Sequence, residues 1–376
     1  MMDYRHLHFV QSTEPLDGGG LGRAAWELSD ALRLIGLKSS LVTTGGSMEQ
    51  RPGLEVYSRF GPAKAFYAPA LNRVARTRVA EAHVIHGHGF YVWPNWVFGR
   101  EVRHQHKLFV YHVHGMFEPW ILARSTWKKR IAHWLFEDAN FTYAGLWRAL
   151  TIKEADQIRT QGITAPIVVC PNGIELSTFG EVSQMRAGIN ATKSKRSLLF
   201  LARLHPKKGL DLLVSAWAAI SKQLRAGWRI VIAGPDELNH CSEVQALARR
   251  LDVSADLEFV GEVSGEAKLR CLAEADAFVL PSRSEGFSVA ILEAMACKLP
   301  VLATTACNFP ELAQNGGGWC VEANVDGIKQ GLVSLLGTTD RERAQRGDAA
   351  RSLVEAQYTW PRIAATIDHS CRQLLT

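Results

Sequence analysis

Short apolar runs recur along the chain, each followed by a polar or glycine-containing loop and a helix-forming segment. Such runs predict buried parallel strands, and the repeated order of strand, loop and helix predicts an α/β protein built from Rossmann-like parts. The predicted strands are residues 7–10, 37–43, 82–85, 108–111, 167–170, 197–201, 228–232, 257–261, 277–280 and 301–303.

The polar segment 181–195 has no clear periodicity and separates two halves that each open with such a unit. A chain of 376 residues is long for one core and suits two domains of about 150 to 200 residues. We therefore expect an N-terminal domain over residues 1–175 and a C-terminal domain over residues 195–357.

The stretch 281–297 carries the strongest chemical signal in the chain. It follows the apolar run 277–280, contains a turn at Gly286, and continues into a helix that Ser288 can cap and that begins at Val289. Free backbone amides and the positive end of the helix dipole then point out of the sheet. An anion such as a diphosphate can bind there.

Two carboxylates flank this anion site, Glu285 before the turn and Glu293 within the helix. A diphosphate repels carboxylates, so these two side chains are better suited to accept hydrogen bonds from hydroxyl groups. A ligand with a diphosphate between two sugars, a nucleotide sugar, meets both requirements. The alternative is a capped helix with two solvated glutamates.

The pattern Glu285-x7-Glu293, with Gly286-Phe287 and the run Glu-Ala-Met-Ala from position 293, resembles the signature of retaining glycosyltransferases of family 4, the group 1 transferases. Members have the GT-B fold, in which two Rossmann-like β/α/β domains face each other across a cleft. The resemblance implies that Glu285 binds donor-sugar hydroxyls and that Glu293 binds the nucleotide ribose. It extends over almost the whole chain, but it is not specific as to the sugar.

The second half matches further family motifs. Arg203 and Lys208 correspond to two cations that hold the donor diphosphate, and Ala202 replaces the usual glycine. Without a metal, two fixed cations can neutralise the charge of a leaving diphosphate; both are expected on a surface loop. The resemblance assigns donor binding to six further residues in this half, Gly234, Val260, Gly286, Phe287, Ser288 and Val289.

In the first half, the loop 17–23 contains Gly19 and Gly20 and precedes an amphipathic helix expected from Ala24 to Leu34. The loop lacks the G-x-G-x-x-G pattern and no acidic residue ends the second strand, so a dinucleotide cofactor is disfavoured. The family places this loop near the donor phosphates and the acceptor. A flexible turn without a ligand is the alternative.

The segment from His114 to Trp120 also resembles a family motif, whose histidine contacts the donor sugar near the reacting carbon. We carry that role to His114 alone. Three further histidines near strand ends are expected to be structural or close to the acceptor, since their spacing is weak evidence for a metal site: His86, His88 and His112. Thr151 and Glu154 resemble a family motif as well, and they also form a predicted capping box.

Residues 120–136 predict one helix with aromatic and aliphatic residues on one face and basic residues around the rest. This composition suits a surface helix that meets an anionic membrane or a lipid diphosphate acceptor. The alternative is a helix that buries its aromatic residues in the N-terminal core. The apolar face holds Trp120, Trp127, Ile131, Trp134 and Leu135, and the basic residues are Arg124, Lys128, Lys129, Arg130 and His133.

Composition gives evidence on the compartment in which the protein works. The net charge of +6 suits anionic ligands but is too small to indicate nucleic acid. Seven scattered cysteines without a C-x-x-C pair favour a reducing compartment, and neither a signal peptide nor an apolar run of spanning length is evident. We therefore expect a cytoplasmic protein, peripheral to the inner face of the cytoplasmic membrane if the basic helix meets lipid.

The resemblance implies a retaining glycosyltransferase that moves a sugar from GDP-mannose or a UDP-hexose to a saccharide or lipid-linked acceptor, in bacterial surface polysaccharide synthesis. No cofactor and no protein-bound metal are expected. The family pattern also implies that the C-terminal segment, residues 358–376, packs as a helix on the N-terminal domain. Two alternatives are a nucleotide-sugar epimerase or hydrolase of the same fold, and a non-catalytic nucleotide-sugar binding protein.

Overall fold

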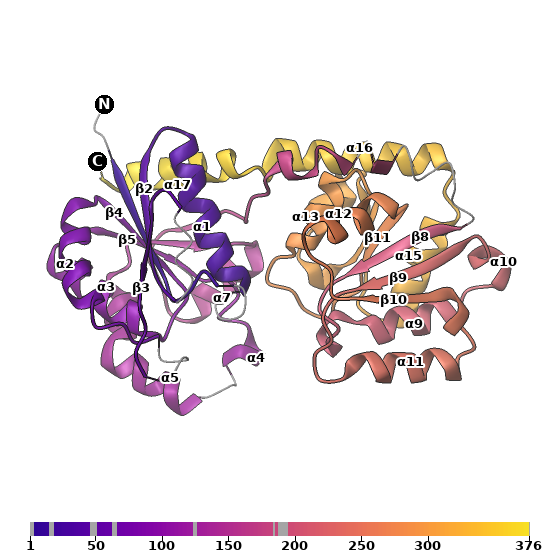
Figure 1. The fold of residues 1–376 in the computed structure, drawn as a ribbon, viewed down its shortest axis with the longest axis horizontal. Helices are drawn as coiled ribbons and strands as arrows, with labels where there is room; N and C mark the ends of the chain where they lie inside the picture. The colour runs from indigo at the N-terminus through magenta and orange to yellow at the C-terminus, as the bar shows by residue number, and fades with distance from the viewer. Residues whose placement is uncertain are drawn as a thin grey trace. The chain divides into compact units, whose positions relative to one another are not determined.

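The computed structural model describes residues 4–14, 19–45, 51–61, 66–122, 126–182, 185–186 and 195–375. The chain forms two compact units (Figure 1). The first unit consists of Met1–Gly173 together with Trp360–Thr376, and the second unit consists of Ile174–Thr359.

The first unit contains a seven-stranded, wholly parallel sheet in the order β3-β2-β1-β4-β5-β6-β7. Its strands are β1 (Arg5–Val10), β2 (Lys38–Thr44), β3 (Leu54–Tyr57), β4 (Val84–His88), β5 (Leu108–His112), β6 (Leu146–Ala149) and β7 (Ile167–Val169). The helices are α1 (Gly19–Leu34), α2 (Leu71–Glu81), α3 (Trp93–His104), α4 (Pro119–Leu122), α5 (Thr126–Ala132), the π-helical turn η2 (His133–Glu137), α6 (Asp138–Tyr143), α7 (Ile152–Thr160) and α17 (Trp360–Leu375).

The two faces of this sheet carry different side chains because residues alternate between faces along each strand. One face is apolar and aromatic and packs against α2, α3 and α7; its central members are Leu7, Phe9, Ile85, Phe109, Tyr111 and Trp147. The other face packs against α1 and α17, which lie side by side (Figure 1). Here apolar residues share the surface with a set of buried histidines.

The second unit contains a six-stranded parallel sheet in the order β10-β9-β8-β11-β12-β13. Its strands are β8 (Arg196–Leu201), β9 (Trp228–Ala233), β10 (Leu257–Gly261), β11 (Ala277–Leu280), β12 (Val301–Thr304) and β13 (Gly318–Val321). Its helices are η3 (Leu176–Phe179), η4 (Pro206–Lys208), α9 (Leu210–Ala218), α10 (Lys222–Arg225), α11 (His240–Arg250), η5 (Ser254–Asp256), α12 (Gly265–Glu274), α13 (Val289–Ala296), η6 (Thr305–Cys307), α14 (Glu311–Gln314), α15 (Val325–Leu336) and α16 (Asp340–Gln357).

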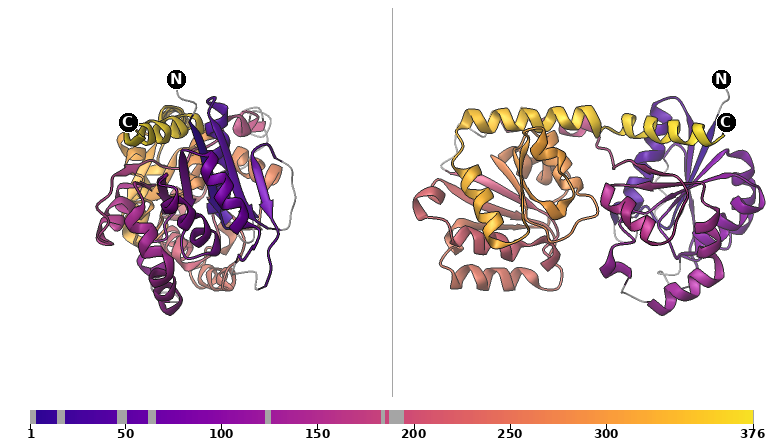
Figure 2. Two further views of the ribbon diagram at one scale, coloured as in Figure 1. Left: turned by 90° about the vertical axis from the view of Figure 1, so that its left-hand side faces the viewer. Right: turned by 180° about the vertical axis from the view of Figure 1, so that it is seen from behind.

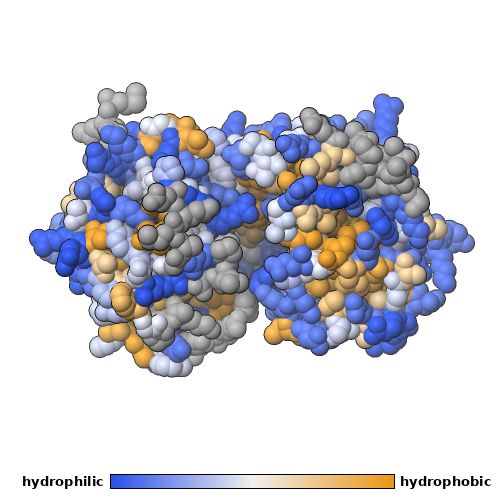
Figure 3. Space-filling model, in the orientation of Figure 1, coloured by the Kyte–Doolittle hydropathy of each residue, from blue (hydrophilic) through white to orange (hydrophobic). Residues whose placement is uncertain are grey.

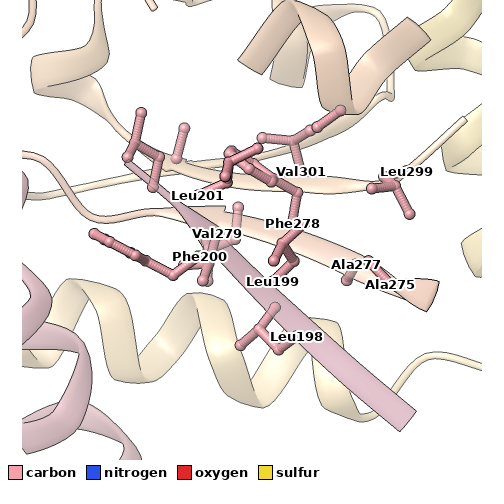
Figure 4. Packing of buried hydrophobic residues seen from close by; sticks show 14 of the residues in the cluster. Leu198, Leu199, Phe200, Leu201, Ala275, Ala277, Phe278, Val279, Leu299 and Val301 are labelled. Carbon is pink, nitrogen blue, oxygen red and sulfur yellow. The ribbon is translucent and has the colours of Figure 1, made fainter. Parts of the chain in front are cut away.

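The central strands β8 and β11 form the core of the second unit (Figure 4). They are apolar on both faces, as expected for parallel strands that helices cover on both sides. Helix α16, yellow in Figure 2, packs on α13 and begins with a complete capping box between Thr339 and Glu342. Arg351 of α16 donates to the carbonyl of Ala296, so α16 packs on the C-terminal end of α13.

Most strand predictions are confirmed within one to three residues at each end, but β3, β6 and β13 were not predicted. Each of these three has four residues, and β3 is only half-buried. β6 contains the charged residue Arg148, which interrupts its apolar pattern. Runs this short and mixed carry little periodic signal.

The prediction of one continuous helix over residues 120–136 is wrong. The described part of this segment consists of α4, α5 and the π-helical turn η2. Residues 123–125, which include Arg124, lie outside the described residues. A π-helical turn widens the helix by one residue per turn, so the spacing that placed the aromatic residues on one face does not hold through it.

Among the described residues, no helix combines the length and the apolar character that crossing a bilayer requires. The face of the molecule shown in Figure 3 is mainly hydrophilic, and smaller groups of hydrophobic residues are exposed on both units.

Candidate active site

The turns that follow β8 and β11 meet through Lys208 and Glu285. The Nζ atom of Lys208 lies 2.6 Å from Oε1 of Glu285, and the hydroxyl of Ser282 donates to the same oxygen at 2.5 Å. Both carboxylate and ammonium are largely buried. The positive charge of Lys208 is therefore paired with the glutamate that the family resemblance assigns to the donor sugar.

The residues after β12 hold the backbone of the Glu285 turn. The side-chain amide of Asn308 donates to the carbonyl oxygen of Glu285 at 2.6 Å, and the amide of Glu285 donates to the carbonyl of Ala306 at 3.0 Å. The hydroxyl of Thr304 donates to the carbonyl of Ser282 at 2.5 Å. These bonds fix the turn from both ends, so the carboxylate is presented by a rigid loop.

Gly209 allows the Lys208 turn to lie against the end of β11. It adopts a φ of +70°, and a Cβ at this position would lie 2.0 Å from the carbonyl oxygen of Pro281. Neither the conformation nor the space admits a side chain. The close approach of the two turns thus depends on this glycine.

Helix α13 starts directly after the Glu285 turn, as predicted. Ser288 is its N-cap, and its side chain accepts from the amide of Ile291 at 3.4 Å. Gly286 and Phe287 connect Glu285 to this cap, and Val289 is the first helical residue. The amides at the start of the helix supply the positive end of the dipole beside the Lys208–Glu285 pair.

Glu293 lies in the second turn of α13 and is also buried. Its Oε1 atom lies 2.7 Å from Nζ of Lys268, which extends from α12. Sequence analysis did not find Lys268, because it lies 25 positions before Glu293 and no motif relates the two. This ion pair uses only Oε1 of Glu293, and Oε2 does not take part in it.

Arg203 follows β8 but has a different environment from Lys208. Its guanidinium pairs with Glu237 at 2.8 and 3.1 Å, and its side chain is 59% exposed compared with 15% for Lys208. The expectation that both cations lie on a surface loop is therefore right for Arg203 and wrong for Lys208. Lys208 is held inside the site by Glu285.

Two further predicted donor residues lie at neighbouring strand ends. Gly234 follows β9 with a φ of +141°, and a Cβ there would lie 1.9 Å from the carbonyl oxygen of Ala202. Val260 is exposed near the end of β10. The amide of Gly234 donates to the carbonyl of Gly261 at 2.8 Å, so the ends of β9 and β10 are joined.

In the first unit, Gly19 and Gly20 open α1 instead of preceding it. The helix begins at Gly19, five residues before the predicted start, and both glycines are exposed with no atom within 4 Å of a built Cβ. Asp17 and Gly18, which belong to the same predicted loop, lie outside the described residues.

His114 lies just beyond β5 in a left-handed conformation with a φ of +51°, followed by Gly115 at +78°. The buried carboxylate of Glu154 accepts from the backbone amides of Gly115 and Leu150. The predicted capping box is thus only half present: Thr151 caps α7, but Glu154 fixes the His114 loop instead of reaching back to Thr151. Burial raises the pKa of Glu154.

Six imidazoles cross the α1- and α17-facing side of the first sheet in two hydrogen-bonded rows. The first row joins Nδ1 of His6 to Nε2 of His86 at 3.0 Å and Nδ1 of His86 to Nε2 of His112 at 2.9 Å. The second row joins Nδ1 of His8 to Nε2 of His88, and Nδ1 of His88 to Nε2 of His114, each at 3.0 Å. Rings from different rows stack, His8 on His86 and His88 on His112, with centroids 4.2 Å apart.

Polar groups close both ends of the first row. Nε2 of His6 lies 3.3 Å from a carboxylate oxygen of Asp368 in α17, and a guanidinium nitrogen of Arg148 lies 3.4 Å from Nδ1 of His112. Arg148 is fully buried and also donates to the carbonyls of Cys170 and Pro171. Burial, aided by Arg148, lowers the pKa of His114 to about 3. Burial likewise places the pKa values of four neighbours well below the usual range: His8, His86, His88 and His112.

Ring nitrogens of His88, His112 and His114 lie within 4.8 Å of one another, which is a separation that a metal ion could bridge. Both nitrogens of His88, and Nε2 of His114, already take part in row hydrogen bonds. The buried cation of Arg148 also stands next to His112. Metal binding would have to break these bonds and place like charges together, so the described residues fit a hydrogen-bonded array better than a metal centre.

The sequence contained a signal for these rows that was not used. The pattern His-x-His occurs four times, and three of these, at 6–8, 86–88 and 112–114, lie on strands, or at the end of one, that are adjacent in the sheet. Residues two apart point to the same face of a strand, so all six histidines could have been placed on one face. His6 and His8 were missed because they precede the first glycine-rich loop and match no motif.

Comparison with known proteins gives the family. Residues 182–353 match the model of "Glycosyl transferases group 1", and residues 18–178 match that of "Glycosyltransferase Family 4". This chain belongs to the family 4, group 1 glycosyltransferases. Its two parallel sheets with interleaved helices are those of the GT-B fold, in agreement with the prediction.

Individual relatives agree with this assignment. The glycosyltransferase chain is 31% identical over 205 residues to a GDP-mannose-dependent monoacylated alpha-(1-6)-phosphatidylinositol monomannoside mannosyltransferase of Corynebacterium glutamicum, with 50% of this chain and 52% of that protein aligned. It is 26% identical to a D-inositol 3-phosphate glycosyltransferase of Actinosynnema mirum over 80% of this chain and 79% of that one. The chain spans about half the length of the mannosyltransferases that it matches.

Among solved structures, HepE of Anabaena in complex with UDP and glucose superimposes on this glycosyltransferase with a TM-score of 0.76. The two sequences are 20% identical, and the alignment covers 98% of this chain and 100% of that one. At this identity the likeness concerns the fold.

The buried histidines predict a steep loss of stability in acid. Five histidines have a lowered pKa in the native protein and the ordinary pKa of about 6.5 in the unfolded chain. Below pH 6.5 the unfolded chain therefore binds protons that the native protein does not bind. The contribution of these histidines to the free energy of unfolding is complete above that pH and is lost as pH falls. Two buried carboxyls act in the opposite sense, because burial raises the pKa of Glu137 to about 7 and also raises that of Glu154. Glu137 offsets about one of the five histidine protons near pH 6 and Glu154 offsets part of another, so the unfolded chain binds about three to four more protons than the native protein. Each costs about 1.4 kcal/mol per pH unit.

We therefore expect the free energy of unfolding, measured in urea between pH 7.5 and 5, to fall by roughly 4 kcal/mol per pH unit below pH 6. The variant His8→Phe removes one buried imidazole and should reduce this slope by about one proton equivalent. A stability that stays constant from pH 7.5 to 5 would contradict the burial of neutral histidines.

Proposed function

We propose that this protein is a retaining, metal-independent glycosyltransferase that moves a hexose from a nucleoside diphosphate sugar to a saccharide or lipid-linked acceptor. The observation that carries the proposal is the meeting of Lys208, Glu285 and the N-terminus of α13 at one edge of the second sheet. A cation, a hydroxyl-binding carboxylate and free amides are the groups that a sugar diphosphate requires.

The ion pair supports an exchange of partners on donor binding. The diphosphate attracts Lys208 more strongly than a single carboxylate does, and Glu285 is then released to accept hydrogen bonds from sugar hydroxyls. Arg203 is exposed and pairs with Glu237 at the surface, so it can turn to the diphosphate at little cost. Gly234, Val260, Phe287 and Glu293 are assigned to the rest of the donor, and Gly19 and Gly20 to its phosphates.

Transfer then breaks the bond between the anomeric carbon and the diphosphate oxygen and forms a bond to the acceptor oxygen on the same face of the sugar. The acceptor hydroxyl gives its proton to the departing diphosphate oxygen. Lys208, Arg203 and the amides of α13 stabilise the negative charge on that leaving group as it develops. No carboxylate is assigned as a nucleophile, so the two-carboxylate scheme of glycosidases is not used.

The donor is GDP-mannose or a UDP-hexose. The mannosyltransferase relatives are GDP-mannose-dependent, whereas HepE was solved with UDP and glucose. Both nucleotides carry the same ribose and diphosphate, so the groups described above serve either one. A thermal-shift screen with GDP-mannose, UDP-glucose and related donors distinguishes them.

An epimerase or hydrolase of the same fold, or a non-catalytic nucleotide-sugar binding protein, is the alternative. Each binds the donor, but they differ in turnover. A hydrolase or epimerase consumes donor without acceptor, a binding protein consumes none, and a transferase requires an acceptor for its full rate.

The exposed aromatic residues favour an acceptor at a membrane surface, as in surface polysaccharide synthesis on the inner face of the cytoplasmic membrane. Trp127 is 63% exposed and Trp134 is 82% exposed, so burial of these two rings in the core is excluded. Lys128 and Arg130 are exposed beside them, and Nζ of Lys128 lies 5.4 Å from the centre of the Trp127 ring. Exposed indoles next to basic residues are suited to an anionic lipid interface.

We expect Lys208→Ala to lower kcat/KM by roughly two to three powers of ten, because one group that stabilises leaving-group charge is lost. Arg203→Ala should lower it by a similar factor with little change in Tm, since the side chain is exposed. Lys208→Ala also leaves the buried Glu285 without its cation, so a lower Tm is expected for that variant alone.

The adjacent variant Lys207→Ala provides a control with the same charge change. Steady-state transfer assays and melting curves on the three variants separate lost catalysis from lost folding. Near-normal kcat/KM in both Lys208→Ala and Arg203→Ala would contradict the diphosphate assignment.

EDTA should leave transfer unchanged, because Lys208, Arg203 and the α13 amides supply the positive charge that a metal would otherwise provide. The measurement is the initial rate in EDTA and in added Mg²⁺ or Mn²⁺. Complete loss in EDTA with recovery on adding either metal would refute metal independence.

Membrane contact should depend on the exposed residues around Trp134. Each basic residue near an anionic surface contributes about 1 kcal/mol, so the double variant K128S/R130S should bind anionic vesicles roughly thirtyfold more weakly. Trp127→Ser with Trp134→Ser should abolish co-sedimentation with little change in Tm, because neither ring is buried.

Leu34→Ser, an exposed apolar residue at the end of α1, serves as the control and should not alter co-sedimentation. A large fall in Tm for the double tryptophan variant, or vesicle binding that does not change with salt, would refute the membrane role.

A further inference from the structure

We propose that His8 and His88 are positioning residues that keep His114 as a neutral imidazole with its proton on Nδ1, so that His114 presents a fixed hydrogen-bond donor to an oxygen of the donor sugar. The sugar as recipient rests on the proposed function. The protonation pattern rests on the hydrogen bonds of the first unit alone.

The first row has only one consistent arrangement of protons. The carboxylate of Asp368 can only accept, so Nε2 of His6 carries a proton, and the bare Nδ1 of His6 accepts from Nε2–H of His86. By the same step, Nδ1 of His86 accepts from Nε2–H of His112. Arg148 can only donate, and it donates to the bare Nδ1 of His112. Both ends therefore require Nε2–H in all three rings.

The second row has one open end, and this end decides its arrangement. Nε2 of His8 is buried and has no hydrogen-bond partner in the described part of the chain. An unpartnered buried N–H is rarer in proteins than an unpartnered acceptor. Nε2 of His8 is therefore the bare nitrogen, His8 donates through Nδ1 to His88, and His88 donates through Nδ1 to Nε2 of His114.

Stacking between the rows supports the same choice. The N–H groups of the first row point from Arg148 towards Asp368, that is, from β6 towards β1. With protons on Nδ1, those of the second row point the opposite way, from β1 towards β5. The dipoles of rings that stack at 4.2 Å then run antiparallel, which is electrostatically favourable.

His114 ends the second row, and its remaining nitrogen is available to a ligand. No hydrogen bond joins its Nδ1 to any described residue, and the side chain is less buried than the other five imidazoles. Because Nε2 accepts from His88, the proton must be on Nδ1. The Glu154 carboxylate fixes the loop through the amide of Gly115, so the direction of this donor is fixed as well.

The test is a measurement of ring protonation in the unliganded full-length protein. With histidines labelled with ¹⁵N, long-range ¹H–¹⁵N correlation spectra distinguish Nδ1–H from Nε2–H rings, and single histidine variants assign the signals. We expect Nδ1–H for His8, His88 and His114, and Nε2–H for His6, His86 and His112. Nε2–H on His114 would overturn the proposal.

Variants separate positioning from folding. His88→Phe removes the donor to His114, whose ring should then shift to the Nε2–H form that isolated histidine prefers. His88→Asn retains an amide donor near the position of Nδ1 and should keep the native form. His86→Phe, an equally buried ring of the first row, is the matched control and should leave His114 unchanged. An unaltered His114 signal in His88→Phe, with Tm values showing that both variants fold, would refute the role of His88.

Activity tests the sugar contact separately. In His114→Asn the amide nitrogen can replace Nδ1, whereas in His114→Gln it replaces Nε2. We expect kcat/KM for donor to be about tenfold higher in His114→Asn than in His114→Gln, the value of one hydrogen bond. Equal values would refute the sugar contact, while absence of transfer in the unmodified protein would refute the proposed function and leave the tautomer result intact.

Discussion

Parallel pairing of every described strand is the constraint on which the site depends. It brings the carboxyl ends of all strands in one sheet to one edge, so turns that are distant in sequence become neighbours. In the second unit this places Lys208, which follows β8, against Glu285, which follows β11. Gly209 and Gly234 show how closely these turns approach, because a side chain at either position would overlap a neighbouring carbonyl oxygen.

Each charge in the donor site has a partner within the protein. Lys208 pairs with Glu285, Lys268 with Glu293, and Arg203 with Glu237. Glu285 and Glu293 are buried, so each would be costly without its lysine, whereas the exposed Arg203–Glu237 pair contributes little. When a diphosphate takes the place of the carboxylate beside Lys208, this buried cation keeps an anionic partner. Under the proposed function, Glu285 and Glu293 therefore have two roles, as partners of the lysines and as acceptors for hydroxyl groups of the donor.

The sequence was sufficient to predict the fold and most of its strands. Strong apolar runs and glycine turns located ten of the strands, and the motif around Glu285 located the start of α13. It was not sufficient for side-chain pairings across elements, such as Lys268 with Glu293, since these depend on helix packing. It also failed at Glu154, whose capping-box spacing is real but whose carboxylate bonds to a different turn. Sequence spacing shows which contacts a residue can make with its neighbours in the chain. Packing in the folded protein determines whether it makes these contacts or others.

The histidine rows replace part of the apolar packing on one face of the first sheet. A face covered by two helices would ordinarily be filled with aliphatic residues, yet six imidazoles and Arg148 occupy it between β1 and β6. Such a network stabilises only when nearly every nitrogen is satisfied, and it is destabilised by acid. What the network provides is a defined direction for each hydrogen bond, because it fixes which nitrogen of each ring carries the proton. An aliphatic core could hold the backbone of the His114 loop, but it could not fix the tautomer of His114.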